Sequence, residues 1–401
     1  MTGGDRRWSE PWLVSETPDA LVVVKPAGVP VRRRSRHGQD GMAEWVQRQR
    51  PGRDLIADGS LTTDEPGRLV LVERGASASE GTRPTAGDDA SPWDAALGER
   101  TTLLDPADTD AFLWVDRHHD GLDDVRIERL GPVALALDYR DRSTPLPEAW
   151  LSGLLDAGVD AVYQQHRPRR GAEDVARLVA GDAAPQFDVH ELGIRYRIDL
   201  EASATSSGLF LDQRETRREL LSTPMAGQTV LNTFAHTGAF SVAAALAGAE
   251  TLTLDLSKHY LDWARENLRL NEIDPDDHDF VYGDALDWMG RFAKRGRRFD
   301  LVIADPPTAS TPRKGSKRWT VGRDLHELVR RSAELTAPGG RVYVSTNFRK
   351  LRWSAFLDHV DRGLADAGRR ARVETRTLPL DHRSDAEDPP YLKAAWLLLE
   401  D

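Results

Sequence analysis

Three aspartates end apolar segments that are typical of buried β-strands. Asp255 ends TLTLD, Asp284 ends DFVYGD and Asp305 ends FDLVIAD. Ligands of a parallel sheet bind beyond the carboxyl ends of its strands, where the strand order reverses. There Asp255 could accept hydrogen bonds from both hydroxyls of a ribose, and Asp284 from an adenine amino group. Alternatively, Asp255 caps the helix that follows it and Asp284 is an ordinary turn residue.

The turn at residues 232–240, which precedes Asp255, contains a single glycine, Gly238. It lacks the G-x-G-x-x-G pattern that holds a dinucleotide pyrophosphate, which counts against NAD and FAD. A turn with so few glycines suits a ligand without phosphates, such as an adenosyl sulfonium. The turn and the two carboxylates in register with it make a more specific pattern than any one of them alone.

Asp305 is followed by two prolines, Pro306 and Pro307. Prolines fix the backbone and remove two amide donors, so this turn is rigid and its carbonyls are free to accept hydrogen bonds. Such a turn can hold a planar base by its edge and face, and a base from a duplex would first be flipped out. By itself the sequence could be a simple strand exit, but its place at the end of a fourth strand favours a base pocket.

Methyl transfer from a sulfonium requires mainly that donor and acceptor be positioned in line. A ring nitrogen with a lone pair, such as guanine N7, needs no base, whereas an exocyclic amine needs a group that accepts its proton. Carbon 5 of a pyrimidine needs a covalent nucleophile, normally cysteine. The chain contains no cysteine, which closes that route and excludes disulfides and thiolate metal sites. We expect no metal site.

The elements that must position these residues alternate between strand and helix from about residue 226. This alternation predicts a doubly wound parallel sheet. Strands are expected at 228–234, 251–256, 279–284, 299–305 and 341–347, helices at 239–248, 257–272, 322–335 and 353–368, and two closing strands at 373–380 and 394–400. The closing pair is joined by a short link and is predicted to form an antiparallel edge.

The region before this sheet divides into three predicted parts. Residues 75–110 are poor in large apolar side chains and are predicted to be a linker between an N-terminal piece, 1–74, and the rest. Residues 111–200 contain alternating apolar segments and one helical segment, which predicts a small α+β domain. The remainder, 201–401, is the predicted doubly wound domain.

The net charge of -11 argues weakly against a nucleic-acid partner, but basic residues are clustered. One cluster is at 166–170; the other two flank Asp305-Pro306-Pro307 and consist of Arg313, Lys314, Lys317 and Arg318, and of Arg349, Lys350 and Arg352. Each cluster could be a solvated surface instead. No apolar segment is long enough to span a bilayer, and the N-terminus lacks a secretory signal, so we expect a cytoplasmic protein.

Residues 187–401 resemble the large-subunit rRNA methyltransferases of the class I fold. The matching motifs are GLFLDQR (208–214), LNTFAHTGAFSVAAALAGA (231–249), LDLS (254–257), WARENLRLN (263–271), GDALDW (283–288) and DPPTAS (305–310). The resemblance implies a Rossmann-like, seven-stranded α/β methyltransferase domain and S-adenosyl-L-methionine as cofactor. The exit of the fifth strand carries Thr346 and Asn347 where the cytosine branch has a catalytic cysteine. This implies the guanine-N7 branch, acting on large-subunit rRNA.

The resemblance also implies roles for particular residues. Asp305, Pro306, Pro307 and Asn347 would shape the base pocket. The residues implied to bind the cofactor are Phe210, Gln213, Arg214, Asn232, Phe234, Thr237, Gly238, Asp255, Leu256, Ser257, Asp284, Ala285 and Asp305. The two basic clusters that flank the proline corner, and the domain at 111–200, would contact RNA.

Two parts of the chain depart from the families they resemble. Residues 21–31 look like the opening of a large pseudouridine synthase, but Thr62 stands where that family has its catalytic aspartate. This implies an inactive remnant at 1–74; a chance strand-turn-strand is the alternative. Within the methyltransferase motifs, Ala309 replaces an aromatic residue, and the segment 204–208 lacks the Lys-Thr-Gly or Asp-Thr-Gly triplet of many relatives.

Two other functions remain open from the sequence. The chain could be a class I methyltransferase that acts on an exocyclic amine or a small molecule, and salt-dependent binding would separate RNA from a small neutral substrate. It could also be a non-catalytic RNA-binding or assembly protein built on the same fold. The intact acids at 255, 284 and 305 argue against that last alternative.

Overall fold

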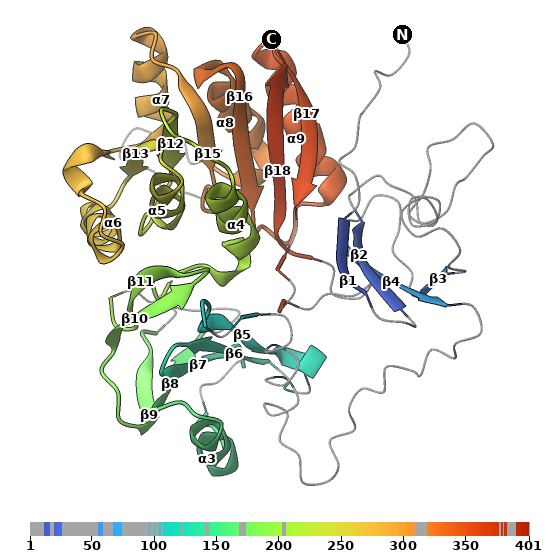
Figure 1. The fold of residues 1–401 in the computed structure, drawn as a ribbon, viewed down its shortest axis with the longest axis vertical. Helices are drawn as coiled ribbons and strands as arrows, with labels where there is room; N and C mark the ends of the chain where they lie inside the picture. Colours follow the sequence, from blue (N-terminus) through green and yellow to red (C-terminus); the bar gives the residue numbers. More distant parts are fainter. Residues whose placement is uncertain are drawn as a thin grey trace.

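The computed structural model places one large sheet at the centre of the C-terminal half (Figure 1). The residues that it describes are 12–16, 20–25, 55–58, 67–73, 96, 100, 104–105, 107–120, 122, 124–140, 144–167, 174–202, 206–308, 319–376, 378–379, 381–382 and 390–400. Among them, no helix is long and apolar enough to cross a membrane.

The large sheet has seven strands in the order β14-β13-β12-β15-β16-β18-β17. Their bounds are β12 Thr229–Thr233, β13 Glu250–Asp255, β14 Asp279–Tyr282, β15 Phe299–Ala304, β16 Thr336–Thr346, β17 Arg370–Arg376 and β18 Lys393–Glu400. The first five in this order are parallel, and β18 is antiparallel to both of its neighbours. The predicted seven-stranded, Rossmann-like class is confirmed.

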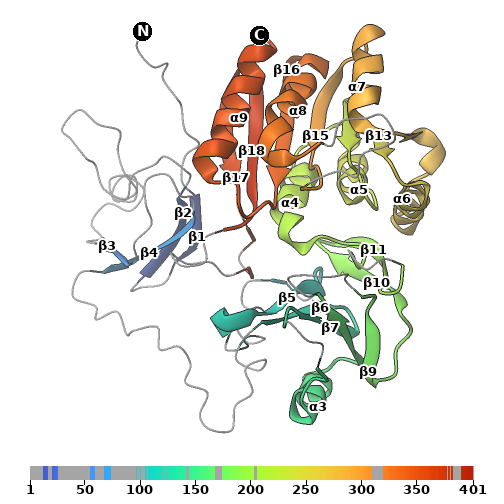
Figure 2. The ribbon, with the colours of Figure 1, turned by 180° about the vertical axis from the view of Figure 1, so that it is seen from behind.

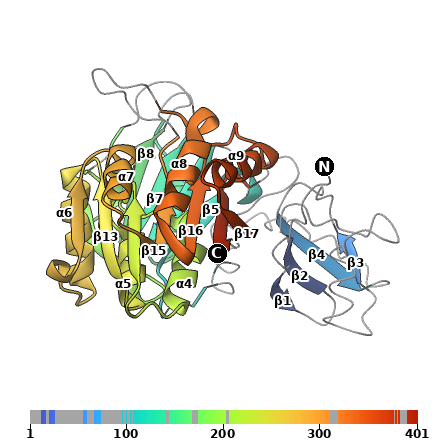
Figure 3. The same cartoon turned by 90° about the horizontal axis from the view of Figure 1, so that it is seen from above.

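Helices cover both faces of this sheet because its strands are apolar on both sides. Val230 and Leu301 pack into one core cluster and Leu231 and Val302 into the other, as alternating strand residues must. The helices are α4 Arg214–Ser222, α5 Ala239–Leu246, α6 Lys258–Leu270, α7 Ala285–Lys294, α8 Val321–Leu335 and α9 Trp353–Asp366. Helices α4 and α5 lie on one face, and α7, α8 and α9 on the other (Figures 2 and 3).

A second sheet of five strands precedes the large one, in the order β5-β6-β7-β8-β9. Its bounds are β5 Ala111–Asp116, β6 Val125–Leu130, β7 Val133–Asp138, β8 Ala161–His166 and β9 Arg177–Gly181, with helix α3 at Glu148–Asp156 between β7 and β8. The hairpin β10 Gln186–Glu191 and β11 Ile194–Asp199 follows, and β11 packs on α6. Short 3-10 turns lie at Arg117–Asp120, Leu211–Gln213 and Pro275–Asp277.

The N-terminal region contributes a separate four-stranded antiparallel sheet in the order β1-β2-β4-β3. Its strands are β1 Trp12–Glu16, β2 Ala20–Lys25, β3 Leu55–Asp58 and β4 Gly67–Glu73. The strand expected from residue 21 is therefore present. Thr62, on which the remnant hypothesis depends, lies outside the described residues, as does most of the predicted linker.

Candidate active site

The turn after β12 lies at the carboxyl edge of the seven-stranded sheet in an unusual backbone conformation. Phe234, His236 and Gly238 have φ values of 55°, 51° and 76°. Gly238 is required there, since a Cβ atom would lie 2.6 Å from the Cβ of Ala264. Positive φ at two non-glycine residues costs roughly 1–3 kcal/mol each, and such strain is concentrated at functional sites.

Asp255 holds this turn against the end of β13. Its carboxylate accepts the main-chain N–H groups of His236 and Ser257, both at 2.8 Å. Burial raises the pKa of the Asp255 carboxyl, and these hydrogen bonds oppose the shift. Because each carboxylate oxygen has two lone pairs, both oxygens can accept a further hydrogen bond, as two ribose hydroxyls require.

Ser257 and Asp284 cap helices. The alternative left open for Asp255 was such a cap, but Ser257 is the N-cap of α6, and Asp284, whose alternative was an ordinary turn residue, is the N-cap of α7. The Asp284 carboxylate accepts the N–H of Asp287 at 3.1 Å, at the start of α7. Ser257 Oγ accepts the N–H of Tyr260 at 3.3 Å, at the start of α6. Each side chain accepts one hydrogen bond as a cap and has a further lone pair that could accept one from a ligand. The cofactor role of both residues stays a prediction.

Asp305 is fixed by residues from two other elements. Its carboxylate accepts hydrogen bonds from Gln213 Nε2 at 3.0 Å and from Ser345 Oγ at 2.7 Å. The Tyr343 hydroxyl donates to Gln213 Oε1 at 2.6 Å and so holds the amide in place. Burial raises the pKa of Asp305 to about 6, although the two hydrogen bonds lower it. Sequence reasoning assigned no role to Ser345 or Tyr343.

Four side chains predicted to contact the cofactor have partners within the protein, and their cofactor role stays a prediction. Gln213 orients Asp305 as described, Asn232 Nδ2 donates to Ser241 Oγ at 3.0 Å, and Thr237 Oγ1 donates to the Gly208 carbonyl at 2.6 Å. Arg214 is fully buried. A motif resemblance gives a residue its position, but not the direction of its side chain.

Arg214 joins three segments that are far apart in the sequence. Its guanidinium contacts the carboxylates of Asp381 at 2.7 Å and Glu191 at 3.4 Å, and it donates to the Ala111 carbonyl at 3.0 Å. Despite the opposing effect of burial, the Arg214 charge holds the pKa of Asp381 well below its usual range. The five-stranded sheet, the β10–β11 hairpin and the segment before β18 are therefore tied to α4 by one buried arginine.

Large apolar side chains are exposed along the carboxyl edge of the sheet. Phe210, Leu256 and Tyr282 are 42%, 45% and 48% exposed. The Phe210 ring lies 4.9 Å from the ring of His236, which lies 4.3 Å from that of Tyr260. Burial lowers the pKa of His236 to about 4, so its ring is neutral near pH 7. An adenosyl group would cover these apolar surfaces while Asp255 accepts from its ribose, so the residues present fit this cofactor.

The remaining predicted cofactor residues lie along the same edge. Phe234 is half-buried, and its ring stacks on Trp319 with centroids 6.2 Å apart. Ala285 is buried in the first turn of α7. Both residues could contact the cofactor through main-chain atoms, so their cofactor role stays a prediction.

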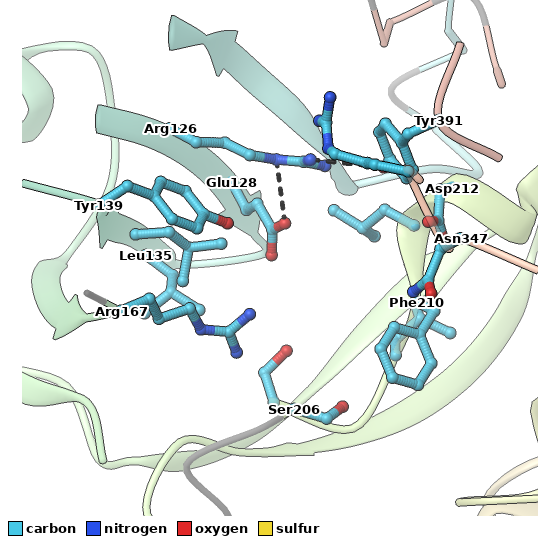
Figure 4. Close-up of a pocket in the computed structure, with 15 residues that line it drawn as sticks. Arg126, Glu128, Leu135, Tyr139, Arg167, Ser206, Phe210, Asp212, Asn347 and Tyr391 are labelled. Carbon is cyan, nitrogen blue, oxygen red and sulfur yellow. Dashed lines mark hydrogen bonds and ion pairs between the residues drawn. The ribbon is translucent and has the colours of Figure 1, made fainter. Parts of the chain in front are cut away.

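A pocket of about 290 Å³ opens beside this edge, between the two sheets (Figure 4). Asn347 lines it and also faces the proline corner, since its Oδ1 lies 3.4 Å from the hydroxyl of Thr308, the residue after Pro307. The full lining is Arg126, Glu128, Leu135, Leu137, Tyr139, Arg167, Ser206, Ser207, Leu209, Phe210, Leu211, Asp212, Asn347, Arg349 and Tyr391. Sequence reasoning missed most of this wall, because it is assembled from distant segments.

Of the two basic clusters that flank the proline corner, one can be placed in the structure. Arg349, Lys350 and Arg352 follow β16 and are exposed, and the Arg349 guanidinium lies 4.7 Å from the centre of the Tyr391 ring. Arg313, Lys314, Lys317 and Arg318 lie outside the described residues, as does Ala309. In the described part of the chain, no group of three or more His, Cys, Asp or Glu side chains is placed to hold a metal ion.

Comparison with known proteins agrees with this geometry. Residues 147–375 match the family model described as S-adenosylmethionine-dependent methyltransferase. YwbD of Bacillus subtilis, provisionally named a ribosomal RNA large subunit methyltransferase, is 31% identical over 311 residues, covering 75% of this chain and 78% of that protein. Ribosomal RNA large subunit methyltransferase K of Neisseria meningitidis serogroup B is 36% identical over 211 residues, covering 50% of this chain and 58% of that protein.

Solved structures share the fold. The crystal structure of SMU.776, provisionally a methyltransferase and complexed with SAH, aligns with a TM-score of 0.67 and 24% identity over 85% of this chain and 87% of that one. At that identity the likeness establishes the fold alone. The family match, the YwbD relationship and the carboxylate-lined edge lead to one assignment. The chain belongs to the S-adenosylmethionine-dependent methyltransferase family and is an enzyme that uses S-adenosylmethionine as its methyl donor.

Proposed function

We propose that the enzyme methylates N7 of a guanine in large-subunit rRNA. The observation that carries this proposal is a single pocket, lined by three arginines, that meets the carboxylate-lined edge at Phe210 and Asn347. The lining also contains the carboxylates of Glu128 and Asp212, so its three arginines leave a small positive excess, which suits a polynucleotide although the whole chain has a net charge of -11. The names of YwbD and of the Neisseria methyltransferase K support the same class of substrate.

The enzyme's own residues mainly bind and orient. S-adenosylmethionine supplies an activated methyl group when bound. Asp255 would hold its ribose, and Phe210 and Leu256 would exclude water from its apolar surfaces. The Asp305–Pro307 corner and Asn347 would hold the acceptor base by its face and edge. A guanine N7 has a lone pair and gives up no proton, so the reaction asks no side chain to act as a base.

An exocyclic amine remains the second candidate acceptor, because Asp305 has a raised pKa and could take a proton. Both of its oxygens, however, already accept hydrogen bonds from Gln213 and Ser345. These hydrogen bonds lower the pKa of Asp305 and so favour the ionised carboxylate over its protonated form. The two products are chemically distinct: N7-methylguanosine allows borohydride- and aniline-induced strand cleavage, and an N2-methylated guanosine does not.

The test uses large-subunit rRNA from a strain that lacks this gene. We expect the purified enzyme to add methyl groups that mass mapping locates at one guanosine and that aniline cleavage identifies as N7. Asn347→Ala should lower the transfer rate about tenfold, the loss of one hydrogen bond, without changing the affinity for S-adenosylhomocysteine. Gln186→Ala, an exposed amide on β10, is the matched control. Unchanged turnover by Asn347→Ala would remove that residue from the base pocket.

We also propose the predicted division of the chain. Residues 201–401 would be the methyltransferase domain, 111–200 a small domain that contacts RNA, and 75–110 a linker. Residues 1–74 would be an inactive pseudouridine-synthase-like segment, and the four-stranded sheet at β1–β4 is compatible with a folded unit there. Expression of 75–401 tests the division and keeps Ala96 and Arg100, which are buried against the five-stranded sheet. Retained methyl transfer would support it, and loss of folding would oppose it.

A further inference from the structure

The five-stranded sheet presents one face to the pocket, and that face combines an apolar floor with one carboxylate. In β6, Val125 and Ile127 pack into the core of this sheet, so Arg126 and Glu128 lie on its opposite face. The register pairs Arg126 with Leu137 and Glu128 with Leu135 on β7. All four residues line the pocket. Leu135 and Leu137 are 2% and 3% exposed and close the bottom of the pocket, so a flat ring would lie above them with its edge against Glu128.

Glu128 is held as a fixed acceptor. Its Oε1 lies 3.4 Å from Nε of Arg126, and both side chains are nearly buried, 13% and 12% exposed. Arg126 is itself anchored, because its other nitrogens contact His382 Nε2 at 2.9 Å and the Tyr391 hydroxyl at 3.4 Å. The Glu128 carboxylate points into the pocket, where Tyr139 and Arg167 also point, and Phe210 and Asn347 line the other side (Figure 4).

Guanine matches this arrangement better than any other base. It is the only one of the four whose Watson–Crick edge offers two adjacent donors, N1–H and the N2 amine, and a carboxylate can accept both. Adenine offers an acceptor at N1, which a carboxylate repels. With guanine's Watson–Crick edge on Glu128, the opposite edge, with N7, is turned away from the five-stranded sheet and toward the side that carries Asn347.

We propose that Glu128 selects the acceptor base: its carboxylate accepts hydrogen bonds from guanine N1–H and N2–H, so that N7 faces Asn347 and the proline corner. This inference rests on the proposed function and deepens it, since a guanine held in this way cannot present its N2 amine to the donor. Half of the acceptor pocket is thus supplied by the five-stranded sheet, outside the methyltransferase sheet.

The test needs the target guanosine, which the wild-type enzyme identifies in the mapping experiment above. An RNA fragment is then prepared with guanosine or with inosine at that position; inosine lacks the N2 amine. We expect wild-type kcat/KM to fall about tenfold on inosine, the loss of one hydrogen bond to a charged group. Glu128→Gln and Glu128→Ala should lower kcat/KM on guanosine about tenfold or more and show no further loss on inosine.

Two measurements separate base selection from a purely structural role. Both variants should stay folded by circular dichroism and should bind S-adenosylhomocysteine with the affinity of Glu148→Gln, an exposed glutamate on α3. The inference would be overturned if Glu128→Ala kept the wild-type kcat/KM on guanosine, or if its kcat/KM fell on inosine as much as that of the wild-type enzyme. Either result would leave the proposed function intact. If the wild-type enzyme methylates no guanosine in rRNA, the proposed function fails first, and base selection by Glu128 fails with it.

Discussion

The cofactor edge of the large sheet and the pocket beside it are built in different ways. The edge is made by successive strand ends between residues 232 and 307. Most of its groups are fixed by nearby residues, as Asp255 is by the N–H groups of His236 and Ser257, although Asp305 is held by Gln213 and Ser345. The pocket draws Glu128, Asn347 and Tyr391 from segments far apart in the chain. Local hydrogen bonds therefore form most of the first site, whereas the second depends on tertiary contacts that join the two sheets.

Breaking the junction between the sheets should have the largest effect. Arg214→Met leaves the buried carboxylate of Asp381 without its arginine, whereas Glu191 keeps its ion pair with Arg217. Breaking a buried ion pair by removing one partner costs about 3–5 kcal/mol. We expect the free energy of unfolding in urea to fall by that amount. Arg218→Met, which is half exposed on the same helix, should change it by less than about 1 kcal/mol. Equal stability of the two variants would mean that Arg214 does not hold the sheets together.

Removing the acceptor at the cofactor edge should affect the first site alone. Asp255→Ala removes a carboxylate that can bind two ribose hydroxyls, a loss of about 3 kcal/mol, or roughly 100-fold in affinity. Calorimetry with S-adenosylhomocysteine measures it. Asp262→Ala, which replaces an exposed aspartate on α6, is the control. Asp255→Asn removes the charge but keeps the shape of the side chain that holds the turn. An affinity within twofold of the wild type would exclude Asp255 from the cofactor site.

The smallest expected effect is on pH dependence, at the point where the two sites meet. Below about pH 6 the Asp305 carboxyl takes up a proton. We expect single-turnover methyl transfer to fall about tenfold between pH 7 and pH 5, because the neutral acid cannot keep both hydrogen bonds from Gln213 and Ser345. Asp305→Asn should be slow and show no inflection near pH 6. An inflection that persists in this variant would assign the titration to another group.

The same pKa gives a stability effect of the opposite sign. The folded pKa of Asp305 lies above the ordinary value of 3.8, so the folded state binds the proton more tightly than the unfolded state. Stability from this group is greatest below about pH 4 and is lost as the pH rises to about 6. Loss of activity at pH 5 would therefore not reflect unfolding driven by Asp305, and circular dichroism at both pH values checks this.

The cofactor edge could be predicted from sequence because its residues end apolar strands. Asp255 and Asp305 lie where the strand pattern put them, and the caps by Ser257 and Asp284 follow from ordinary helix-start chemistry. Helix α7 was not predicted, although Asp284 followed by Met289 and Phe292 on one buried face was a usable signal. Strands β8, β9 and β10 were missed as well; β9 is largely exposed, so its apolar residues form no buried pattern.

The acceptor pocket could not be predicted in this way. The position of Glu128 opposite Asn347 depends on how two sheets pack, and neither strand carries a local pattern that reports it. The motif gave the position of Arg214, but not the ion pairs of its side chain with the buried carboxylates of Asp381 and Glu191. Only tertiary contacts determine which of these charges face a ligand.

A crystal structure with S-adenosylhomocysteine tests most directly whether edge and pocket form one active site. We expect the adenosyl ribose on the Asp255 carboxylate and the sulfur atom facing the pocket between Phe210 and Asn347. A ligand bound elsewhere, or one whose sulfur is walled off from that pocket by protein side chains, would contradict a shared site.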